Sequence, residues 1–393
     1  MTRDSSEFFG SKSAQAVLKH GLLTRYAIYF GVRAGKATSG RVAFIDGYAG
    51  AGRYDDGSPG SPLLLASQAK RAEAFKRNVR LAFVETDAKC RTRLEASLAE
   101  HEVNADIIDP RPFEIAAPEL LDHYANHAIL TFVDPFGLAL SSDSLVAMLG
   151  RSNRRRPIDV LYHFSLSSVA RMGRAGVSDR AKFREDNARH LDNALGDIDW
   201  RTPFTASTDP TRTAIEVANT FAAKIYAMTG MRSTSIAVRQ RQNQQPKYML
   251  MLFSADPTGK AHWEFAGCAA KAHIDWLLHC DTADYDAEMA AHDSIGLLQL
   301  LPADRPSSVE ISKRVTTSND IAMYNHLRTL FEKRRAIRPI DDVPAVFGRL
   351  LGTAGPPSVR TAVKRLHAEG LVDDSGIGDF HSRTITWTGA NEC

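Results

Sequence analysis

Asp46, Gly50 and Gly52 are the residues whose types and spacing point most directly to chemistry in this chain. The apolar run 42–45 precedes Asp46, and a loop of small residues follows it. This pattern predicts a buried parallel strand that ends in a loop, and open α/β sheets bind nucleotide-like ligands at that edge. Glycines there let the backbone approach a ligand closely. We predict that a nucleoside cofactor binds over Asp46, Gly47, Tyr48, Ala49, Gly50 and Gly52.

The spacing after these glycines distinguishes between classes of nucleoside cofactor. A dinucleotide-binding loop carries a third glycine and opens directly into a helix, whereas residues 53–60 separate Gly52 from the next predicted helix. Ser61 is expected to cap that helix, with Pro62 at its first position. A pyrophosphate on a helix N-terminus fits this spacing poorly. S-adenosylmethionine (SAM) has no phosphate, so the loop predicts SAM as the cofactor; the alternative is a turn that binds no ligand.

Carboxylates end two further predicted strands. Glu85 directly follows the apolar run 80–84, and Asp109 ends the run 105–109. An acid after the second strand of a Rossmann-like sheet accepts hydrogen bonds from ribose hydroxyls, so we assign this role to Glu85. Asp87 is the alternative ribose ligand, or it caps the helix that follows; both acids also suit a helix N-terminus through its dipole. Asp109 is expected near the adenine amino group, or in a solvated turn.

The fourth apolar run, 128–133, leads into Asp134, Pro135, Phe136 and Gly137. Amino-methyltransferases carry an Asp/Asn-Pro-Pro-aromatic segment at this point, in which the acid and a proline carbonyl accept hydrogen bonds from the target amine. We therefore predict Asp134 and Pro135 as acceptors for that amine and Phe136 as the ring that stacks on a base. The aromatic residue stands one position early here, and the alternative is a structural turn with a buried Phe.

These segments together resemble the three-Cys-motif partner (TcmP) family, a methyltransferase-like group, over roughly residues 12–280. The matching pieces are an early helix with Lys19, Leu22, Leu23 and Tyr26, the run 44–54, the Gly60-Ser61-Pro62 helix start, and the runs 83–87 and 133–137. The resemblance implies a SAM-binding Rossmann-like fold. It also implies a partner that looks like a radical-SAM protein with three clustered cysteines, and it implies no particular substrate.

Bulk composition indicates an intracellular enzyme. The chain has 393 residues, 44% hydrophobic and 24% charged, with a net charge of +3. No apolar run reaches the length of a membrane span, and the polar segment 1–13 lacks the core of a signal peptide. We therefore predict a cytoplasmic protein that does not contact a membrane.

The cysteines are scattered and none are paired at metal-ligand spacing, so we predict reduced thiols and no metal site. They are Cys90, Cys268, Cys280 and Cys393. A site built from His273, His279, Cys280 and His292 is the disfavoured alternative.

The order of apolar runs and helical patterns predicts an α/β fold. Strands and helices alternate over residues 41–169, which is the doubly wound pattern, and residues 170–230 are expected to form a helical insertion that covers the site. Runs 235–239 and 247–254 predict the antiparallel hairpin that ends methyltransferase sheets. A helix over 263–279 is expected to close this Rossmann-like domain, which we assign to residues 1–280.

The rest of the chain predicts a linker over 281–305 and a winged helix-turn-helix domain over 306–393. Expected helices are 321–335, 343–351 and 358–369, followed by a strand at 382–387. In the third helix, Ser358 is expected as the cap. Arg360, Lys364 and Arg365 lie off its apolar face, where a recognition helix meets nucleic acid. The alternative is a winged helix that docks on a protein.

The sequence thus predicts a SAM-dependent methyltransferase, with an amino group on a DNA or RNA base as the favoured acceptor. One alternative is a peptide or small-molecule methyltransferase that acts with a three-Cys-motif, radical-SAM-like partner. The other is a catalytically inactive SAM-fold module that binds DNA or serves as a scaffold.

Overall fold

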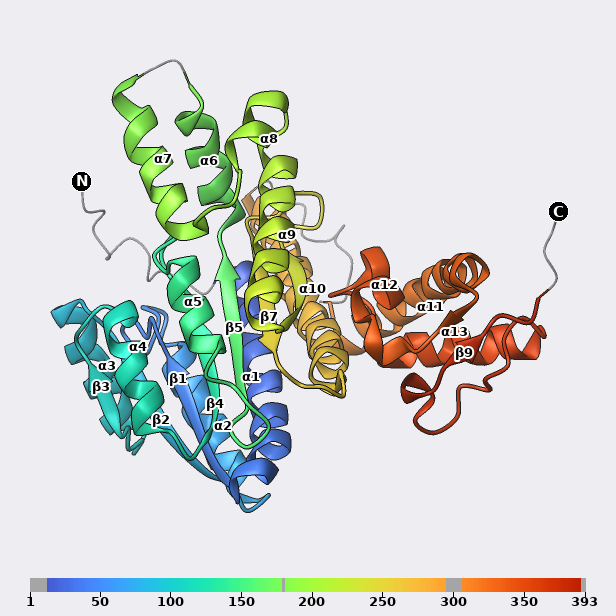
Figure 1. The fold of residues 1–393 in the computed structure, drawn as a ribbon, viewed down its shortest axis with the longest axis horizontal. Coiled ribbons are helices and arrows are strands. Elements are labelled where there is room, and N and C mark those ends of the chain that lie inside the picture. Colours follow the sequence, from blue (N-terminus) through green and yellow to red (C-terminus); the bar gives the residue numbers. More distant parts are fainter. Residues whose placement is uncertain (1–12, 179–180, 295–305, 390–393) are drawn as a thin grey trace. The chain divides into compact units, whose positions relative to one another are not determined.

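The apolar runs predicted as strands form one seven-stranded sheet in the order β3-β2-β1-β4-β5-β7-β6 (Figure 1). The strands are β1 Arg41–Asp46, β2 Asn78–Val84, β3 Ile107–Asp109, β4 Ala128–Val133, β5 Ile158–Phe164, β6 Arg232–Val238 and β7 Tyr248–Ser254. Strands β1 to β5 are parallel, and β7 is antiparallel to both β5 and β6. The predicted parallel sheet and its terminal antiparallel hairpin are confirmed.

This computed structural model describes residues 13–178, 181–294 and 306–389. The chain divides into two units. The first unit contains residues 23–256, and the second contains residues 14–22 together with the chain from Pro257 onward. Helix α1, Ala14–Ala34, therefore contributes to both units.

Helices cover the sheet of the first unit because its central strands are apolar on both faces. Every residue of β4 is buried, and so are all residues of β1 after the first. Such strands need a layer of helices on each side. The connecting helices are α2 Ser61–Glu73, α3 Ala88–Glu100, α4 Phe113–His123 and α5 Ser142–Leu149.

The predicted insertion is helical, and Figure 1 shows its first helices beyond the carboxyl end of β5. It comprises α6 Leu166–Gly176, α7 Ala181–Leu195, α8 Arg201–Ala206 and α9 Pro210–Thr229. The short helix α8 lies between the two longer helices α7 and α9. Trp200 is fully buried and donates a hydrogen bond from Nε1 to Asp192 at 2.9 Å, and Phe221 of α9 stacks on Tyr162 of β5. These aromatic anchors attach the insertion to the sheet.

The first helix of the second unit is longer than predicted, and the unit begins earlier in the chain than predicted. Helix α10 runs from Lys260 to Ser294, so residues 281–294 of the predicted linker are helical, and residues 295–305 lie outside the described part of the chain. The expected helix 263–279 also belongs to this unit, whose boundary falls at Asp256 rather than at residue 280. The reason is packing: Trp263 lies in the core of the second unit, 5.5 Å between ring centroids from Phe347.

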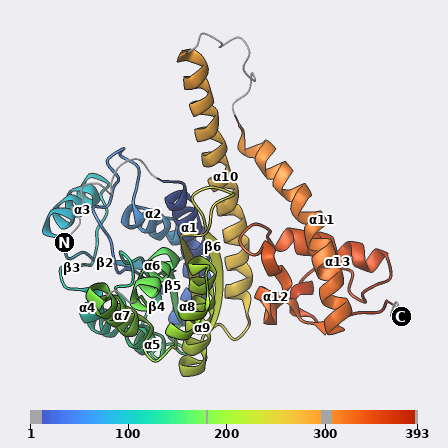
Figure 2. The same ribbon diagram turned by 90° about the horizontal axis from the view of Figure 1, so that it is seen from above.

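The other elements of the second unit are α11 Ser308–Arg334, β8 Ala336–Ile337, α12 Val343–Phe347, α13 Pro356–Ala368 and β9 Ile385–Thr386. Figure 2 shows α11, α12 and α13 grouped together. Helix α11 begins well before the predicted residue 321, because Ser307 and Glu310 form a capping box.

Two predicted helix caps are wrong for the same reason. Helix α2 is capped by the backbone of Gly60, and α13 by that of Gly355, with no side-chain cap in either case. Ser61 and Ser358 are instead buried inside the first turn. A proline fits the first turn of a helix, so each helix starts at least one residue earlier than its serine suggests.

Candidate functional site

The loop after β1 is tied to the strands on both sides of it. The side chain of Asp46 is fully buried and its Oδ1 accepts a hydrogen bond from the amide of Tyr48 at 3.1 Å. The Gly47 amide donates to the carbonyl of Phe132 at 2.9 Å, and the Ala49 amide donates to that of Val84 at 2.9 Å. The ends of β4 and β2 therefore set the path of the loop.

Glycine is required in this loop for two reasons. Gly50 and Gly52 have φ values of 64° and 78°, a region that side chains rarely allow. A Cβ at Gly47 would lie 2.9 Å from the ring of Phe113, and one at Gly52 would lie 3.1 Å from Leu94. The loop is thus a close-fitting backbone surface at the carboxyl edge of the sheet, as predicted.

Glu85 lies beside this loop, because its Oε2 accepts a hydrogen bond from the Gly50 amide at 2.8 Å. Its Oε1 accepts from the Asp87 amide at 2.7 Å. Each carboxylate oxygen has two lone pairs, so the group can still accept a hydroxyl. Asp87 caps α3 by accepting from the Cys90 amide, a bond that lowers the pKa of Asp87. The cap interpretation of Asp87 is therefore confirmed, and Glu85 remains the predicted ribose ligand.

Asp109 ends β3, and its backbone carbonyl accepts a hydrogen bond from the Glu85 amide at 3.0 Å. Its carboxylate binds Arg111, with Nη2 2.7 Å from Oδ2 and Nε 3.1 Å from Oδ1. The bonds from Arg111 lower the pKa of Asp109. Asp109 is thus an ionised group at the same edge of the sheet, and its contact with adenine stays a prediction.

Asp134 lies at the carboxyl end of β4 and faces a histidine that the sequence analysis did not identify. Its Oδ1 is 3.3 Å from Nδ1 of His163, a residue of β5. The ring of His163 lies edge-on to that of Tyr248, with 4.1 Å between centroids. Burial, and then the charge of Asp134, raise the pKa of Tyr248 well above its ordinary value. The sequence signal for His163 is a polar residue within the apolar run 160–164.

Phe136 is 70% exposed, so the alternative of a structural turn with a buried Phe is wrong. Its neighbour Pro135 is buried. A groove of about 1680 Å³ begins at Phe136 and Gly137 and extends between the loop after β4 and the helices α6 and α7. The segments that follow β4 and β5 therefore line a large groove.

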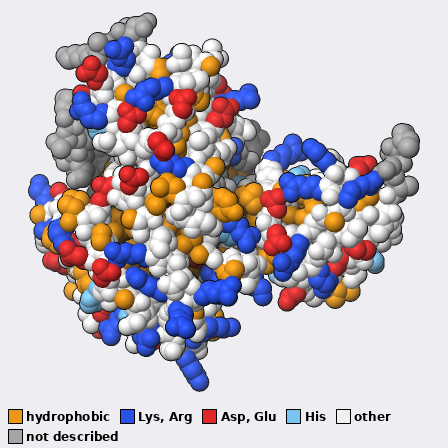
Figure 3. All heavy atoms as spheres, in the orientation of Figure 1, with side chains coloured by type: hydrophobic (Ala, Val, Ile, Leu, Met, Phe, Trp, Pro, Cys, Tyr) orange, Lys and Arg blue, Asp and Glu red, His pale blue; other side chains and the backbone are white. Residues whose placement is uncertain are grey.

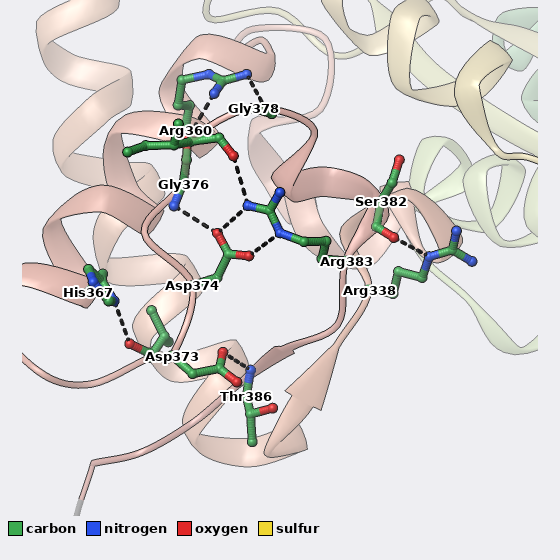
Figure 4. A network of polar contacts seen from close by, with 12 residues as sticks. Arg338, Arg360, His367, Asp373, Asp374, Gly376, Gly378, Ser382, Arg383 and Thr386 are labelled. Atoms are coloured by element: carbon green, nitrogen blue, oxygen red, sulfur yellow. Dashed lines mark hydrogen bonds and ion pairs between the residues drawn. The ribbon is translucent and has the colours of Figure 1, made fainter.

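In the second unit, Arg360 binds the loop between α13 and β9 (Figure 4). Its guanidinium donates to the carbonyls of Gly376 at 2.8 Å and Gly378 at 3.2 Å, and it lies over the ring of Phe380. The predicted phosphate contact of Arg360 would compete with these bonds.

The other two predicted phosphate ligands lie nearer the surface of α13. Arg365 pairs with Glu369 at 3.0 Å and lies over the ring of Tyr324. Lys364 is exposed. On the face drawn in Figure 3, each unit carries both cationic and anionic side chains, and the net charge of the chain is only +3.

The loop that Arg360 holds is also fixed from within (Figure 4). Asp374 binds Arg383 through two hydrogen bonds of 2.7 and 2.9 Å and accepts a third from the Gly376 amide at 2.8 Å. The bonds from Arg383 lower the pKa of Asp374. The Asp373 carboxylate accepts from the Thr386 amide at 2.7 Å. This loop is therefore an ordered projection beside α13.

Cys90, Cys268 and Cys280 form no disulfide within the described part of the chain, and Cys393 lies outside it. Within the described ranges, no group of three or more metal-ligating side chains is found, and the side chain of His292 lies outside them. None of the described helices is both long and apolar enough to cross a membrane.

No family model and no curated protein matches this chain. Among solved structures, it is similar to coclaurine N-methyltransferase bound to N-methylheliamine and SAH, at 10% identity over 55% of this chain and 67% of that one, with a TM-score of 0.23. The cyclopropane synthase MmaA2 from Mycobacterium tuberculosis gives 10% identity over 56% and 82%, with a TM-score of 0.24. Geranyl diphosphate methyltransferase with GPP and sinefungin gives 12% over 56% and 77%, with a TM-score of 0.23. At these scores the likeness assigns no site residue.

Proposed function

We propose that this chain is a SAM-dependent methyltransferase whose cofactor binds over the loop from Asp46 to Gly52. The observation that carries the proposal is the joining of that loop to Glu85 through the Gly50 amide, 2.8 Å from Oε2. This bond brings a close-fitting backbone and the carboxylate that we propose as the ribose ligand together at one edge of the mostly parallel sheet. The resemblance to the TcmP family points to the same cofactor.

The start of α2 favours SAM over a dinucleotide. Residues 53–60 fold back, so the helix start comes to lie beside Gly52, where a pyrophosphate would bind. However, the Gly60 amide is already bonded to the Gly52 carbonyl at 2.8 Å, and Pro62 has no amide hydrogen. Two donors that a phosphate would use are therefore missing, whereas SAM has no phosphate. SAM supplies an electrophilic methyl group on a positively charged sulfur.

The groove beside Phe136 is the proposed site of the methyl acceptor. Its volume of about 1680 Å³ exceeds the roughly 300–1,000 Å³ of ordinary small-molecule pockets. A macromolecular acceptor therefore suits it better than a small one. With Asp134 at the strand end and an exposed ring at Phe136, we favour an amino group on a nucleic-acid base, which must be unpaired to enter such a site.

Calorimetry of the wild-type protein is expected to show SAM binding and no NAD binding. Gly50→Val should abolish detectable SAM binding, because the valine must adopt a positive φ at the cofactor surface. Glu85→Gln removes the negative charge that would accept hydrogen bonds from the ribose hydroxyls. It should weaken SAM binding by about 1.5–3 kcal/mol, roughly 10- to 150-fold.

Gly230→Val is the matched control for Gly50→Val. Gly230 also has a positive φ, 71°, but an added Cβ would meet nothing within 4 Å, and it lies at the end of α9. Its SAM affinity should equal that of the wild type. Heat of binding from NAD and none from SAM would contradict the proposal.

We further propose that the second unit is a winged helix that contacts nucleic acid. Strand β8, which lies between α11 and α12 in the chain, pairs with β9. Val372 precedes the loop 373–384, and Trp387 follows β9; these two residues form an isolated antiparallel bridge. Two helices, here α12 and α13, followed by a loop between short antiparallel strands are typical of winged helices. The three-Cys-motif partner implied by the TcmP resemblance is the alternative ligand for this unit.

A salt series of binding to a short DNA duplex tests this proposal. The Lys364→Glu, Arg365→Glu double variant should bind more weakly, and its plot of log K against log salt should be shallower by about 0.9 for each phosphate that the variant no longer neutralises. The Lys313→Glu, Lys333→Glu double variant on α11 controls for the change in net charge, because it also replaces two exposed cations with anions. Arg360 is left intact because it holds the adjacent loop. Identical slopes in wild type and double variant would favour protein docking, to be tested by co-purification with the three-Cys-motif partner.

A further inference from the structure

Asp134 and His163 occupy equivalent positions at the ends of two adjacent parallel strands. The register pairs Val133 of β4 with Tyr162 of β5, so the next residue of each strand is one of this pair. Their nearest polar atoms, Oδ1 and Nδ1, are 3.3 Å apart. The side chains are only 19% and 13% exposed, which strengthens an electrostatic contact between them.

The imidazole ring also contacts Tyr248, the first residue of β7, whose ring meets it edge-on. The raised pKa of Tyr248 keeps its phenol neutral, so it offers the imidazole no competing charge. Of these two neighbours, Asp134 is thus the one that carries a charge.

A carboxylate that faces one imidazole nitrogen favours the proton on that nitrogen and leaves the lone pair on the other. We propose that His163, oriented at Nδ1 by Asp134, is the base that accepts the proton of the methyl acceptor at Nε2. This inference rests on the proposed methyltransferase function and adds to it the residue that removes the proton from the acceptor nitrogen.

The proposed step balances without another reactant. The acceptor nitrogen forms its bond to the methyl carbon while the carbon–sulfur bond breaks and its electron pair remains on sulfur. The proton that the nitrogen loses passes to Nε2 of His163 and then to solvent. Asp134 and His163 are not among the residues that line the groove. Phe136 and Ser167, which follow them shortly in the chain, do line it, so the acceptor would approach the proposed base along the segments that leave these two strands.

The first test needs no substrate. In protein labelled with ¹⁵N-histidine, the neutral His163 ring should carry its proton on Nδ1, with its signals assigned by their loss in His163→Gln. In Asp134→Asn this preference should be lost or inverted, because the amide can donate to Nδ1. His190 is the internal control, since its Nδ1 lies 2.7 Å from the Asp186 carbonyl within α7, and its tautomer should not change. The same His163 tautomer in both proteins would overturn the proposal.

The second test separates a base from a structural residue. With labelled SAM and a single-stranded oligonucleotide containing all four bases, His163→Ala should lower kcat by about 10²- to 10⁴-fold. Its SAM affinity should stay within twofold of wild type, and added imidazole should restore part of the rate. His123→Gln, on α4, should behave as wild type. A normal kcat in His163→Ala, or a loss that imidazole does not rescue, would overturn the proposal.

The two tests also distinguish this proposal from the function on which it rests. If the wild-type protein binds no SAM, the methyltransferase function fails, and so does the role of His163 in it. If SAM binds and methyl transfer occurs but the tautomer is unaffected by Asp134→Asn, only the role of His163 fails.

Discussion

Asp134→Ala is expected to lower turnover by about 100-fold or more while SAM affinity stays within a few-fold of wild type. Asp134 lies at the end of β4, 3.3 Å from His163, and it shortly precedes Phe136, which lines the groove. Its proposed partners are the methyl acceptor and His163, and neither holds the cofactor. The measurement is transfer from labelled SAM, with SAM affinity determined separately by calorimetry.

Asp122→Ala is the matched control for this variant. Asp122 is also a carboxylate in the first unit, but it is 70% exposed and pairs with Arg151 at the surface. Its turnover should equal that of the wild type. Normal turnover in Asp134→Ala would mean that the Asp-Pro-Phe-Gly segment is only a structural turn, and thermal unfolding of both variants checks that each is folded.

Asp159→Ala is expected to destabilise the first unit by about 3–5 kcal/mol, the usual cost of breaking a buried ion pair. The carboxylate of Asp159 is buried under α1, where Tyr26 donates to Oδ2 at 2.7 Å and Ser254 donates to Oδ1 at 2.6 Å. Arg33 lies 3.3 Å from Oδ2. Alanine would leave all three partners without this acceptor, so the midpoint of urea unfolding should fall.

Asp159→Asn should cost less than Asp159→Ala. Burial is the largest influence on the pKa of Asp159 and raises it despite the adjacent Arg33, so the ionised form is itself costly here. An asparagine keeps an acceptor for Tyr26 without that charge. Asp122→Ala, which breaks only an exposed ion pair, should change stability by less than about 1 kcal/mol. An equal loss of stability in Asp159→Ala and Asp122→Ala would contradict the stabilising role assigned to the buried contacts of Asp159.

The parallel sheet was predictable from the sequence because its signals are local. A continuous apolar run such as 128–133 must be buried on both faces, and alternation of such runs with helices leaves few other arrangements. The residues that follow each run, such as Glu85 and Asp134, therefore lie at one edge of the sheet. For the same reason the glycine loop was predicted correctly, since its positive φ values depend on residue type.

The unit boundary was predicted incorrectly because helical periodicity does not say which core a helix joins. Residues 263–279 have the pattern of an amphipathic helix, and the sequence alone does not say whether they close the sheet or join the tail. Trp263 packs against Phe347, more than eighty residues later, and this contact assigns the helix to the second unit. The same limit applies to Ser61 and Ser358, whose apparent capping role is overridden by burial in the first helical turn.

The chain by itself determined the sheet, the glycine loop and the acids at the strand ends, because each depends on residue types that are neighbours in sequence. Only the tertiary structure decided which of these acids meets which partner. His163 has no recognisable motif, and it faces Asp134 because the register of β4 and β5 places the two residues side by side. Register and packing bring together residues that are far apart in sequence, and no local pattern encodes such a pairing.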